Sequence, residues 1–253
     1  MKTQTLVVYS CFLLLSCASK VQQQSPAPIP KVAAAPTLNP QGPFRIETHK
    51  PADVVNILTA TTKVQITMAY AGDNNFTGKA VPGYQANSCY LEENAAQALA
   101  RVALQAERLG YGLQLLDCYR PQRASSHFML WVGNTADQIT KAVYYPNLDK
   151  SQLNQGYIAN FSGHSRASTV DLTLLKKNAA GQWQQLDMGG TYDLFDPVSH
   201  LDSPAVSPQQ KANRLLLKDL MQQQGFAAYA MEWWHFTLAN EKYPDTYFDF
   251  PVN

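Results

Sequence analysis

The sequence predicts an α+β domain in which an antiparallel sheet is backed by helices. Segments with the periodicity of helices and segments with the residue content of strands follow one another in mixed order, without the strand–helix–strand alternation of a parallel sheet. No glycine-rich phosphate-binding loop follows a strand. About 210 residues remain after an N-terminal region of different composition, enough for one domain with a substantial core.

The first part of this domain is expected to contain two helices with a strand between them. A stripe of apolar residues at helical spacing predicts a helix over about 91–109, and Gly110 stands where a C-terminal cap is expected. The segment "YGLQLLDCYRP" (111–121) is typical of a strand that ends in a turn at Pro121. A second helix is expected over about 122–131.

The later part is expected to contain two strands, a surface hairpin and a third helix. "STVDLTLL" (168–175) has the content of a buried strand, and 175–190 is expected to form an exposed hairpin. Ser207 can cap a helix that ends before Gly225. The aromatic-rich segment "YAMEWWHFTL" (229–238) predicts a further strand.

The first 43 residues differ from the rest of the chain. Residues 1–16 contain a short apolar run that is typical of a secretory signal peptide and too short to span a bilayer. Cys17, directly after "LLS", resembles the lipidated cysteine of a bacterial lipobox; an ordinary cleaved signal is the alternative. Residues 17–43 are rich in Pro, Gln and Ala and contain no aromatic residue, so they are expected to form a disordered tether.

These features predict export and lipid anchoring. Ser19, two positions after Cys17, favours the outer membrane by resemblance to Gram-negative sorting signals. The protein is therefore expected in the periplasm, anchored to the outer membrane as a lipoprotein, with a soluble periplasmic or secreted form as the alternative. Only the lipid anchor would contact a membrane.

Charge and cysteine content limit the possible partners. A formal net charge of +1, without a run of basic residues, gives no reason to expect nucleic-acid binding, and no feature indicates a protein partner. Cys89 and Cys118 remain for the mature fold. In an oxidising compartment they could form a disulfide, which we expect, or they could be two buried thiols.

Three segments contain side chains that can carry chemistry: "DCYRP" (117–121), "SGHSRASTVD" (162–171) and "EWWHF" (232–236). Each also has a purely structural explanation. A histidine can be a packed ring with one hydrogen bond, Asp171 can cap a turn, and Arg120 can be a surface charge. The combination of the three segments is what favours chemistry.

His164, Asp171 and His235 together supply two imidazole nitrogens and one carboxylate oxygen, a set that suits one Zn²⁺ with a fourth position open for water. Glu232 could act on that water, because water on zinc loses its proton near neutral pH. Residues three apart in an ideal strand point to opposite faces. Glu232 and His235 therefore need a bulge or a turn between them to share one site.

These segments resemble the D-alanyl-D-alanine dipeptidase family, the metallopeptidases that include the vancomycin-resistance dipeptidases. The similarity covers nearly everything from about Tyr70 to the last residue. The family patterns S-x-H-x-x-G-x-x-x-D, E-W-W-H and D-G-Y-R-P lie over Ser162–Asp171, Glu232–His235 and Asp117–Pro121, and "NNFTG" (74–78) and "YFDFPV" (247–252) also match. The resemblance implies one zinc-peptidase domain over 44–253.

The resemblance implies a catalytic role for each matching residue. His164, Asp171 and His235 would hold one Zn²⁺ per chain. Glu232 would take a proton from the attacking water and pass it to the leaving amine. Arg120 would stabilise the oxyanion of the tetrahedral intermediate.

The resemblance also implies how the substrate is bound. Asp193, helped by Tyr70, would bind the free ammonium of a dipeptide, and Ser162 is a candidate for its terminal carboxylate. A site that pairs both termini rejects longer chains, because the missing charges would leave buried partners unpaired. The expected activity is hydrolysis of D-Ala-D-Ala and similar free dipeptides, in cell-wall turnover or scavenging.

The sequence departs from the family pattern at two glycines. The family glycine between the histidine and the aspartate is Ala167 here, which would strain the loop by roughly 1 kcal/mol if its φ is positive. The family glycine before the tyrosine is Cys118, a substitution that would permit pairing with Cys89. Neither change removes an expected metal ligand.

Two other functions remain open at this point. A D,D-carboxypeptidase or endopeptidase acting on peptidoglycan stem peptides could have the same fold, but Asp193 argues against it because those substrates lack a nearby free amine. A catalytically inactive zinc-binding module is the alternative of another class. The presence of Glu232 and Arg120 argues against that alternative.

Overall fold

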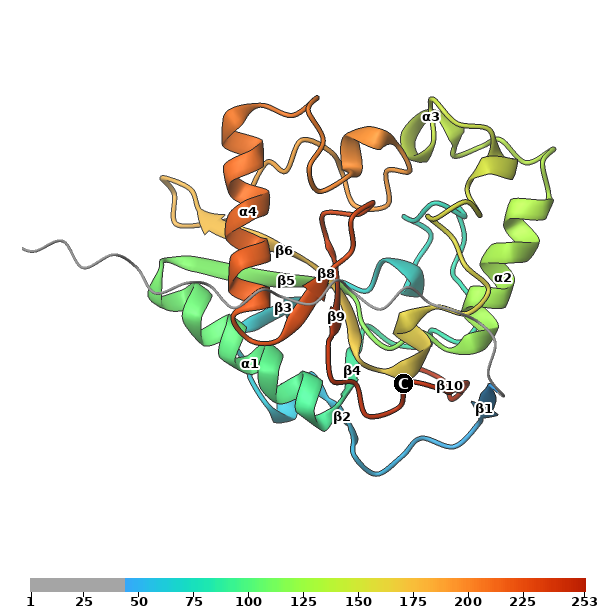
Figure 1. Ribbon diagram of the computed structural model, residues 1–253, viewed down its shortest axis with the longest axis horizontal. Helices are drawn as coiled ribbons and strands as arrows, with labels where there is room; N and C mark the ends of the chain where they lie inside the picture. Colours follow the sequence, from blue (N-terminus) through green and yellow to red (C-terminus); the bar gives the residue numbers. More distant parts are fainter. Residues whose placement is uncertain (1–43) are drawn as a thin grey trace, which may run out of the picture. The chain divides into compact units, whose positions relative to one another are not determined.

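The computed structural model describes residues 44–253, and the predicted signal peptide, Cys17 and tether lie outside the described residues. A six-stranded sheet forms the centre of the described chain (Figure 1). Its strands are, in spatial order, β3 (Val64–Ile66), β5 (Tyr111–Asp117), β6 (Thr169–Lys177), β9 (His235–Leu238) and β8 (Phe226–Ala228), and β7 (Trp183–Gln185) also pairs with β6. The predicted α+β class is confirmed.

One edge of the sheet differs from the antiparallel arrangement that we expected. β3 pairs with β5 in parallel, whereas the other strand pairs of this sheet are antiparallel. The parallel pair is possible because a long connection, which contains α1, separates the two strands along the chain. The sheet is therefore mixed.

Helices cover the sheet on one side. α1 (Glu93–Arg108) and α4 (Pro208–Gln222) pack against it, and apolar side chains of both helices share one core with β5, β6 and β9. In Figure 1, α2 (Gln122–Gly133) and the short α3 (Lys141–Tyr144) lie to the right of the central strands, away from α1 and α4. A second, aromatic-rich core includes buried residues of α2.

Short elements complete the described chain. β1 (Arg45–Glu47) pairs in parallel with β10 (Thr246–Phe248), and β2 (Val54–Asn56) pairs antiparallel with β4 (Tyr90–Glu92). The 3₁₀ turns are η1 (Ile57–Thr59), η2 (Ala69–Ala71), η3 (Lys150–Gln152), η4 (Gly163–Arg166) and η5 (Pro197–Ser199). No helix among residues 44–253 is both long enough and apolar enough to cross a bilayer.

The capping residues expected from the sequence lie at the helix ends, but α1 begins two residues later than predicted. α1 begins at Glu93, because the Glu92 carboxylate accepts hydrogen bonds from the backbone N–H groups of Asn94 and Ala95 and so caps the helix. Gly110 follows its end at φ +81°. Ser207 caps α4 as predicted, and Gly225 lies beyond the end of α4 at φ +90°.

The prediction of one strand over 229–238 is wrong. β8 and β9 form an antiparallel hairpin in which Ala228 lies opposite Phe236, so the chain must reverse between them. The residues before His235 make this turn, and the His235 N–H donates to the Glu232 carbonyl at 3.3 Å. The turn removes the difficulty that a strand would place Glu232 and His235 on opposite faces.

β6 has a different function on each of its faces. Val170, Leu172 and Leu174 lie in the core shared with the helices, so the alternation of a strand turns Asp171 to the opposite face. β6 then continues into the hairpin with β7, whose residues are exposed, as predicted for 175–190.

Candidate metal centre and active site

Strand register aligns three polar residues across the sheet. Asp171 in β6 lies opposite Asp117 in β5 and opposite His235 in β9. A bulge shifts the β5–β6 register between Leu115, which pairs with Leu172, and Asp117. The extra residue turns Asp117 to the face of Asp171, since directly opposite residues share a face.

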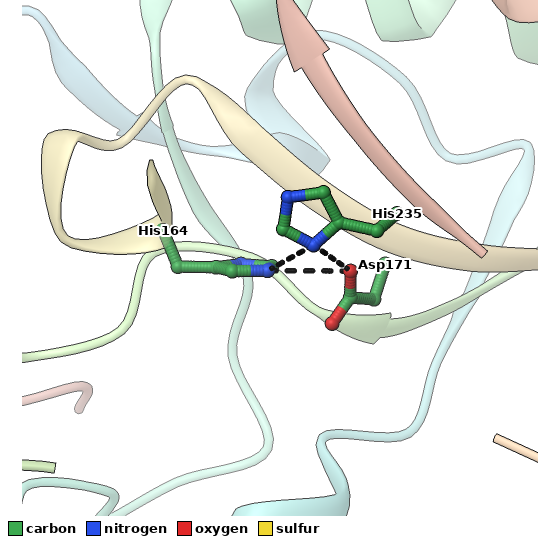
Figure 2. A group of neighbouring side chains, drawn as sticks. All are labelled: His164, Asp171 and His235. Carbon is green, nitrogen blue, oxygen red and sulfur yellow. Dashed lines mark hydrogen bonds and ion pairs between the residues drawn. The ribbon is translucent and has the colours of Figure 1, made fainter. Parts of the chain in front are cut away.

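The side chains of His164, Asp171 and His235 converge on one point (Figure 2). His164 Nε2 lies 3.2 Å from Asp171 Oδ1, His235 Nδ1 lies 3.0 Å from the same oxygen, and the two nitrogens are 3.3 Å apart. Burial raises the pKa of Asp171, but the two imidazoles offset this and hold it below its usual range. The group is therefore a carboxylate between two histidines.

The backbone around His164 fixes which of its nitrogens faces this point. η4 places the ring, with the Ser162 hydroxyl accepting from the His164 N–H at 3.3 Å. His164 Nδ1 lies 2.7 Å from the Cys118 carbonyl, which can only accept, so Nδ1 carries a proton and Nε2 is the nitrogen left to bind a metal ion. Cys118 is joined to Cys89 by a disulfide, with both sulfurs buried.

The three donor atoms fit a tetrahedral metal ion. Ligand atoms about 2.0–2.1 Å from one such ion lie about 3.3 Å apart, close to the observed separations. Asp171 Oδ1 is buried and accepts no hydrogen bond from the described residues, so a metal ion would supply the partner that this oxygen lacks. A backbone carbonyl that orients one ligand histidine is a usual feature of metal sites.

The loop between His164 and Asp171 is strained at one residue. Ala167 has φ +60°, in the left-handed region that favours glycine. Next to it, Arg166 donates to both carboxylate oxygens of Glu241, at 2.7 and 2.9 Å. This buried ion pair fastens the strained loop to the C-terminal part of the chain.

Glu232 lies beside the metal-facing atoms without belonging to the triad. Its Oε2 is 3.5 Å from His235 Nδ1, and the residue is buried. Burial, and then the negative charges of Asp171 and Asp193, raise the pKa of Glu232 well above its usual range. A carboxylate with a raised pKa can both accept and return a proton near neutral pH.

Arg120 is held by Asp117 next to the same site. Its Nε and Nη2 donate to Asp117 Oδ2 at 2.9 and 2.8 Å, and Nη2 is 3.9 Å from Asp171 Oδ2. The guanidinium carbon lies 5.2 Å from the Tyr70 ring centroid and 5.0 Å from that of Phe128. Burial alone would lower the pKa of Arg120, but Asp117 and nearby phenols more than offset this.

A second buried carboxylate lies near the triad, with two phenols between them. The Tyr70 hydroxyl donates to Asp193 Oδ2 at 2.9 Å. The Tyr192 hydroxyl lies 3.1 Å from that of Tyr70 and 3.1 Å from Asp171 Oδ2. Burial, and then the charge of Asp171, raise the pKa of Asp193 well above its usual range. A cation bound there would relieve this unfavourable charge.

Comparison with known proteins identifies the group to which these features belong. The peptidase M15 family model, described as D-ala-D-ala dipeptidase, matches residues 47–253. The chain belongs to this family.

Individual relatives agree with the family match. The D-alanyl-D-alanine dipeptidase of Streptomyces coelicolor is 48% identical over 184 residues, which span 72% of this chain and 90% of that protein. The protein of the same name from Enterococcus faecium is 41% identical over 184 residues, with the same two coverages. The one from Escherichia coli is 34% identical over 186 residues, or 74% of this chain and 84% of that protein.

As expected of a metallopeptidase of this family, residues far apart in the sequence come together. The triad, Glu232 and Arg120 surround one point, and Tyr70 and Asp193 are hydrogen-bonded nearby. Ser162 is the N-cap of η4, so its position beside His164 follows from that local role.

Sequence reasoning assigned no role to Asp117, Tyr84 and Tyr192. Asp117 is buried between Arg120 and Tyr84, whose hydroxyl donates to Asp117 Oδ1 at 2.6 Å. The "DCYRP" segment contained a signal for Asp117, since a carboxylate three residues before an arginine can pair with it. Tyr84 and Tyr192 carried no comparable signal, because their contacts depend on the packing of distant segments.

The segment that carries Tyr192 and Asp193 is anchored at both ends by one buried arginine. Arg214 of α4 donates from Nε to the Met188 carbonyl at 2.6 Å and from Nη1 to the His200 carbonyl at 2.7 Å. Asp193 itself has φ +60°, a left-handed conformation that aspartate tolerates better than most residues. This segment is thus positioned by side-chain contacts and is outside the sheet.

Proposed function

We propose that this chain is a zinc-dependent dipeptidase that hydrolyses D-Ala-D-Ala and similar free dipeptides to single amino acids. The observation that carries the proposal is the buried Asp193, which is connected through Tyr70 and Tyr192 to the metal-facing Asp171. A carboxylate held this close to a metal site suits a substrate in which the residue that carries the scissile carbonyl also carries a free ammonium.

Zinc is the ion that best suits the donor set. Two imidazoles and one carboxylate in a tetrahedral arrangement, with a fourth position left for water, are typical of catalytic zinc sites. When bound, zinc would polarise the peptide carbonyl and lower the pKa of a water molecule.

Glu232 would then transfer the proton, and Arg120 would stabilise the developing negative charge. Glu232, with its raised pKa, accepts the proton of the attacking water and returns it to the leaving amine. Arg120 uses Nε and Nη2 for Asp117. Its remaining N–H groups would stabilise the developing oxyanion. Asp117 keeps the guanidinium in place during the reaction.

The two ends of the substrate would be paired by different residues. Asp193 and Tyr70 bind the ammonium, and Ser162 binds the terminal carboxylate. The Ser162 oxygen accepts from the His164 N–H, so its own proton is available for donation to a carboxylate. A longer peptide would place neutral amides against these partners and leave a buried charge unpaired.

A D,D-carboxypeptidase or endopeptidase that acts on stem peptides is less well supported. Such an enzyme has no use for a buried carboxylate at the amine position. An inactive zinc-binding module is also less well supported, because Glu232 and Arg120 are both present beside the triad.

We propose that the protein works in the periplasm, with residues 1–16 as its signal peptide and Cys17 as its lipid attachment site at the outer membrane. The disulfide between Cys89 and Cys118 suits an oxidising compartment. An enzyme at this location would act on dipeptides released during cell-wall turnover. Metabolic labelling with a fatty acid, compared between wild type and Cys17→Ala, tests the anchor.

Zinc analysis combined with a D-Ala release assay tests the activity. Purified protein should contain about one Zn²⁺ per chain and release D-Ala from D-Ala-D-Ala, and it should lose both properties after treatment with a chelator. Protein that contains zinc but does not cleave the dipeptide would refute the proposed substrate.

A further inference from the structure

The two oxygens of Asp171 have different surroundings. Oδ1 faces the imidazole nitrogens of His164 and His235 and accepts no hydrogen bond from the described residues. Oδ2 lies 3.1 Å from the Tyr192 hydroxyl and 3.9 Å from Arg120 Nη2. Only Oδ1 is thus placed to bind a metal ion, and a phenol holds the other oxygen.

The Tyr192 hydroxyl has one proton and two neighbours. Its oxygen lies 3.1 Å from Asp171 Oδ2 and 3.1 Å from the Tyr70 hydroxyl, which donates to Asp193. A carboxylate is a stronger acceptor than a phenol oxygen, so the proton of Tyr192 is directed to Asp171. The same oxygen also lies against Tyr70, which binds the second carboxylate.

The Tyr192 ring is placed independently of its hydroxyl. It packs edge-to-face on Trp234, with the ring centroids 5.5 Å apart, and Trp234 is buried directly before the metal-facing His235. The backbone on either side is held by Arg214 through the Met188 and His200 carbonyls. Removal of the hydroxyl alone should therefore leave the ring in place.

We propose that Tyr192 is a positioning residue for the metal centre: its hydroxyl holds Oδ2 of Asp171, so that Oδ1 alone faces the metal ion. This inference rests on the proposed function for the presence of the metal. Hydrogen bonds to a ligand carboxylate fix its orientation, and loss of such a bond typically weakens metal binding 10–100-fold. The same hydroxyl lies between the metal-facing triad and the Tyr70–Asp193 pair that would bind the substrate's ammonium.

The decisive experiment compares Zn²⁺ affinity in three full-length variants by competition with a chromogenic chelator. Tyr192→Phe should bind Zn²⁺ about 10–100-fold more weakly than wild type. Tyr70→Phe keeps the Tyr192–Asp171 contact, so it should bind Zn²⁺ as wild type does and show its defect in KM for the dipeptide. Tyr119→Phe is the matched control, because it also loses a buried phenol hydrogen bond, to the Phe250 carbonyl at 2.8 Å.

Thermal unfolding of the metal-free proteins separates positioning from general destabilisation. Tyr192→Phe and Tyr119→Phe should lower Tm to a similar extent, while only Tyr192→Phe weakens Zn²⁺ binding. The visible absorption of Co²⁺-substituted protein should change in Tyr192→Phe alone, since the geometry of the carboxylate ligand changes.

Zn²⁺ affinity equal to wild type in Tyr192→Phe would overturn the inference, and a wild-type chain that binds no Zn²⁺ would overturn both proposals. A third outcome would separate the two proposals. If wild type binds Zn²⁺ and the variants show the predicted order of affinities, but D-Ala-D-Ala is not cleaved, then the proposed substrate is wrong and the role of Tyr192 stands.

Discussion

Two halves of this site are built in different ways: the metal half, which contains His164, Asp171 and His235, and the half proposed to bind the substrate's ammonium (the ammonium half), which contains Tyr70 and Asp193. Asp171 and His235 are neighbours in a hydrogen-bonded strand register, so backbone pairing fixes their separation. Tyr70 and Asp193 lie in η2 and in an irregular segment, and they are connected only through side-chain hydrogen bonds. Backbone pairing thus fixes Asp171 and His235, whereas the residues proposed to bind the substrate's ammonium lie outside the sheet and are held by side-chain contacts.

The largest effect on turnover should come from loss of Glu232, the proposed proton carrier beside the metal half. Glu232→Gln keeps the shape of the side chain, but the amide cannot accept a proton. kcat should therefore fall by about 10²–10⁴-fold while zinc content stays near that of wild type. His164→Ala is the contrasting variant and should lose zinc and activity together. Metal analysis and turnover measured on the same preparations check both. More than about a tenth of wild-type turnover in Glu232→Gln would contradict its role as the general base.

A smaller effect is expected when the ammonium half is disrupted. Acetylation of the amine of D-Ala-D-Ala removes the charge that pairs with Asp193, and an unpaired buried charge costs roughly 3–5 kcal/mol. kcat/KM should therefore fall by about two orders of magnitude or more. Asp193→Asn should lose activity on the free dipeptide. The difference in kcat/KM between the free and the acetylated dipeptide should therefore be smaller in this variant than in wild type.

Zinc content provides the control for this second prediction. Asp193→Asn should keep its zinc, because Tyr70 and Tyr192 lie between Asp193 and the triad. If wild type hydrolyses the acetylated dipeptide faster than the free one, the chain acts as a carboxypeptidase and the dipeptidase proposal is wrong.

The same contrast explains what the sequence could predict. His164, Asp171 and His235 have chemically distinctive side chains in local motifs, so their combination indicated a metal site before the fold was known. The sequence required a bulge or a turn between Glu232 and His235 only if both residues share one site. It did not predict which of the two forms, because the aromatic residues around Glu232 suit a strand equally well. The hairpin register that forces the chain to reverse depends on pairing between β8 and β9.

Long-range packing accounts for the residues that were missed. The bulge that turns Asp117 toward Asp171 has no local sequence signal, since it depends on the partner strand. The contacts of Tyr192 with Asp171 and with Tyr70 span 21 and 122 positions in sequence. Such contacts follow from the assembled fold, so the motifs could not reveal them.

The disulfide should affect stability more than it affects the metal half. Cys89 and Cys118 are 29 positions apart, and closing a loop of this length is worth about 3.5 kcal/mol. The double variant Cys89→Ala, Cys118→Ala should unfold at correspondingly lower denaturant concentration and keep its zinc, because His164 Nδ1 bonds the backbone carbonyl of residue 118. Loss of zinc from the folded variant would show that the disulfide also positions the ligand.

The smallest effect is expected in the strained loop that joins His164 to Asp171. Ala167→Gly relieves the strain of a left-handed alanine, which should stabilise the fold by roughly 1 kcal/mol. It also removes a buried methyl group worth about 0.8 kcal/mol. Glycine further increases the conformational freedom of the unfolded chain, which lowers stability. These terms nearly cancel, so the free energy of unfolding should change little. Ala100→Gly in α1 is the matched control, where glycine relieves no strain and should cost about 1 kcal/mol. If Ala167→Gly costs more than Ala100→Gly in denaturant titrations, the methyl packing outweighs the strain, and the alanine stabilises this loop beside the metal ligands.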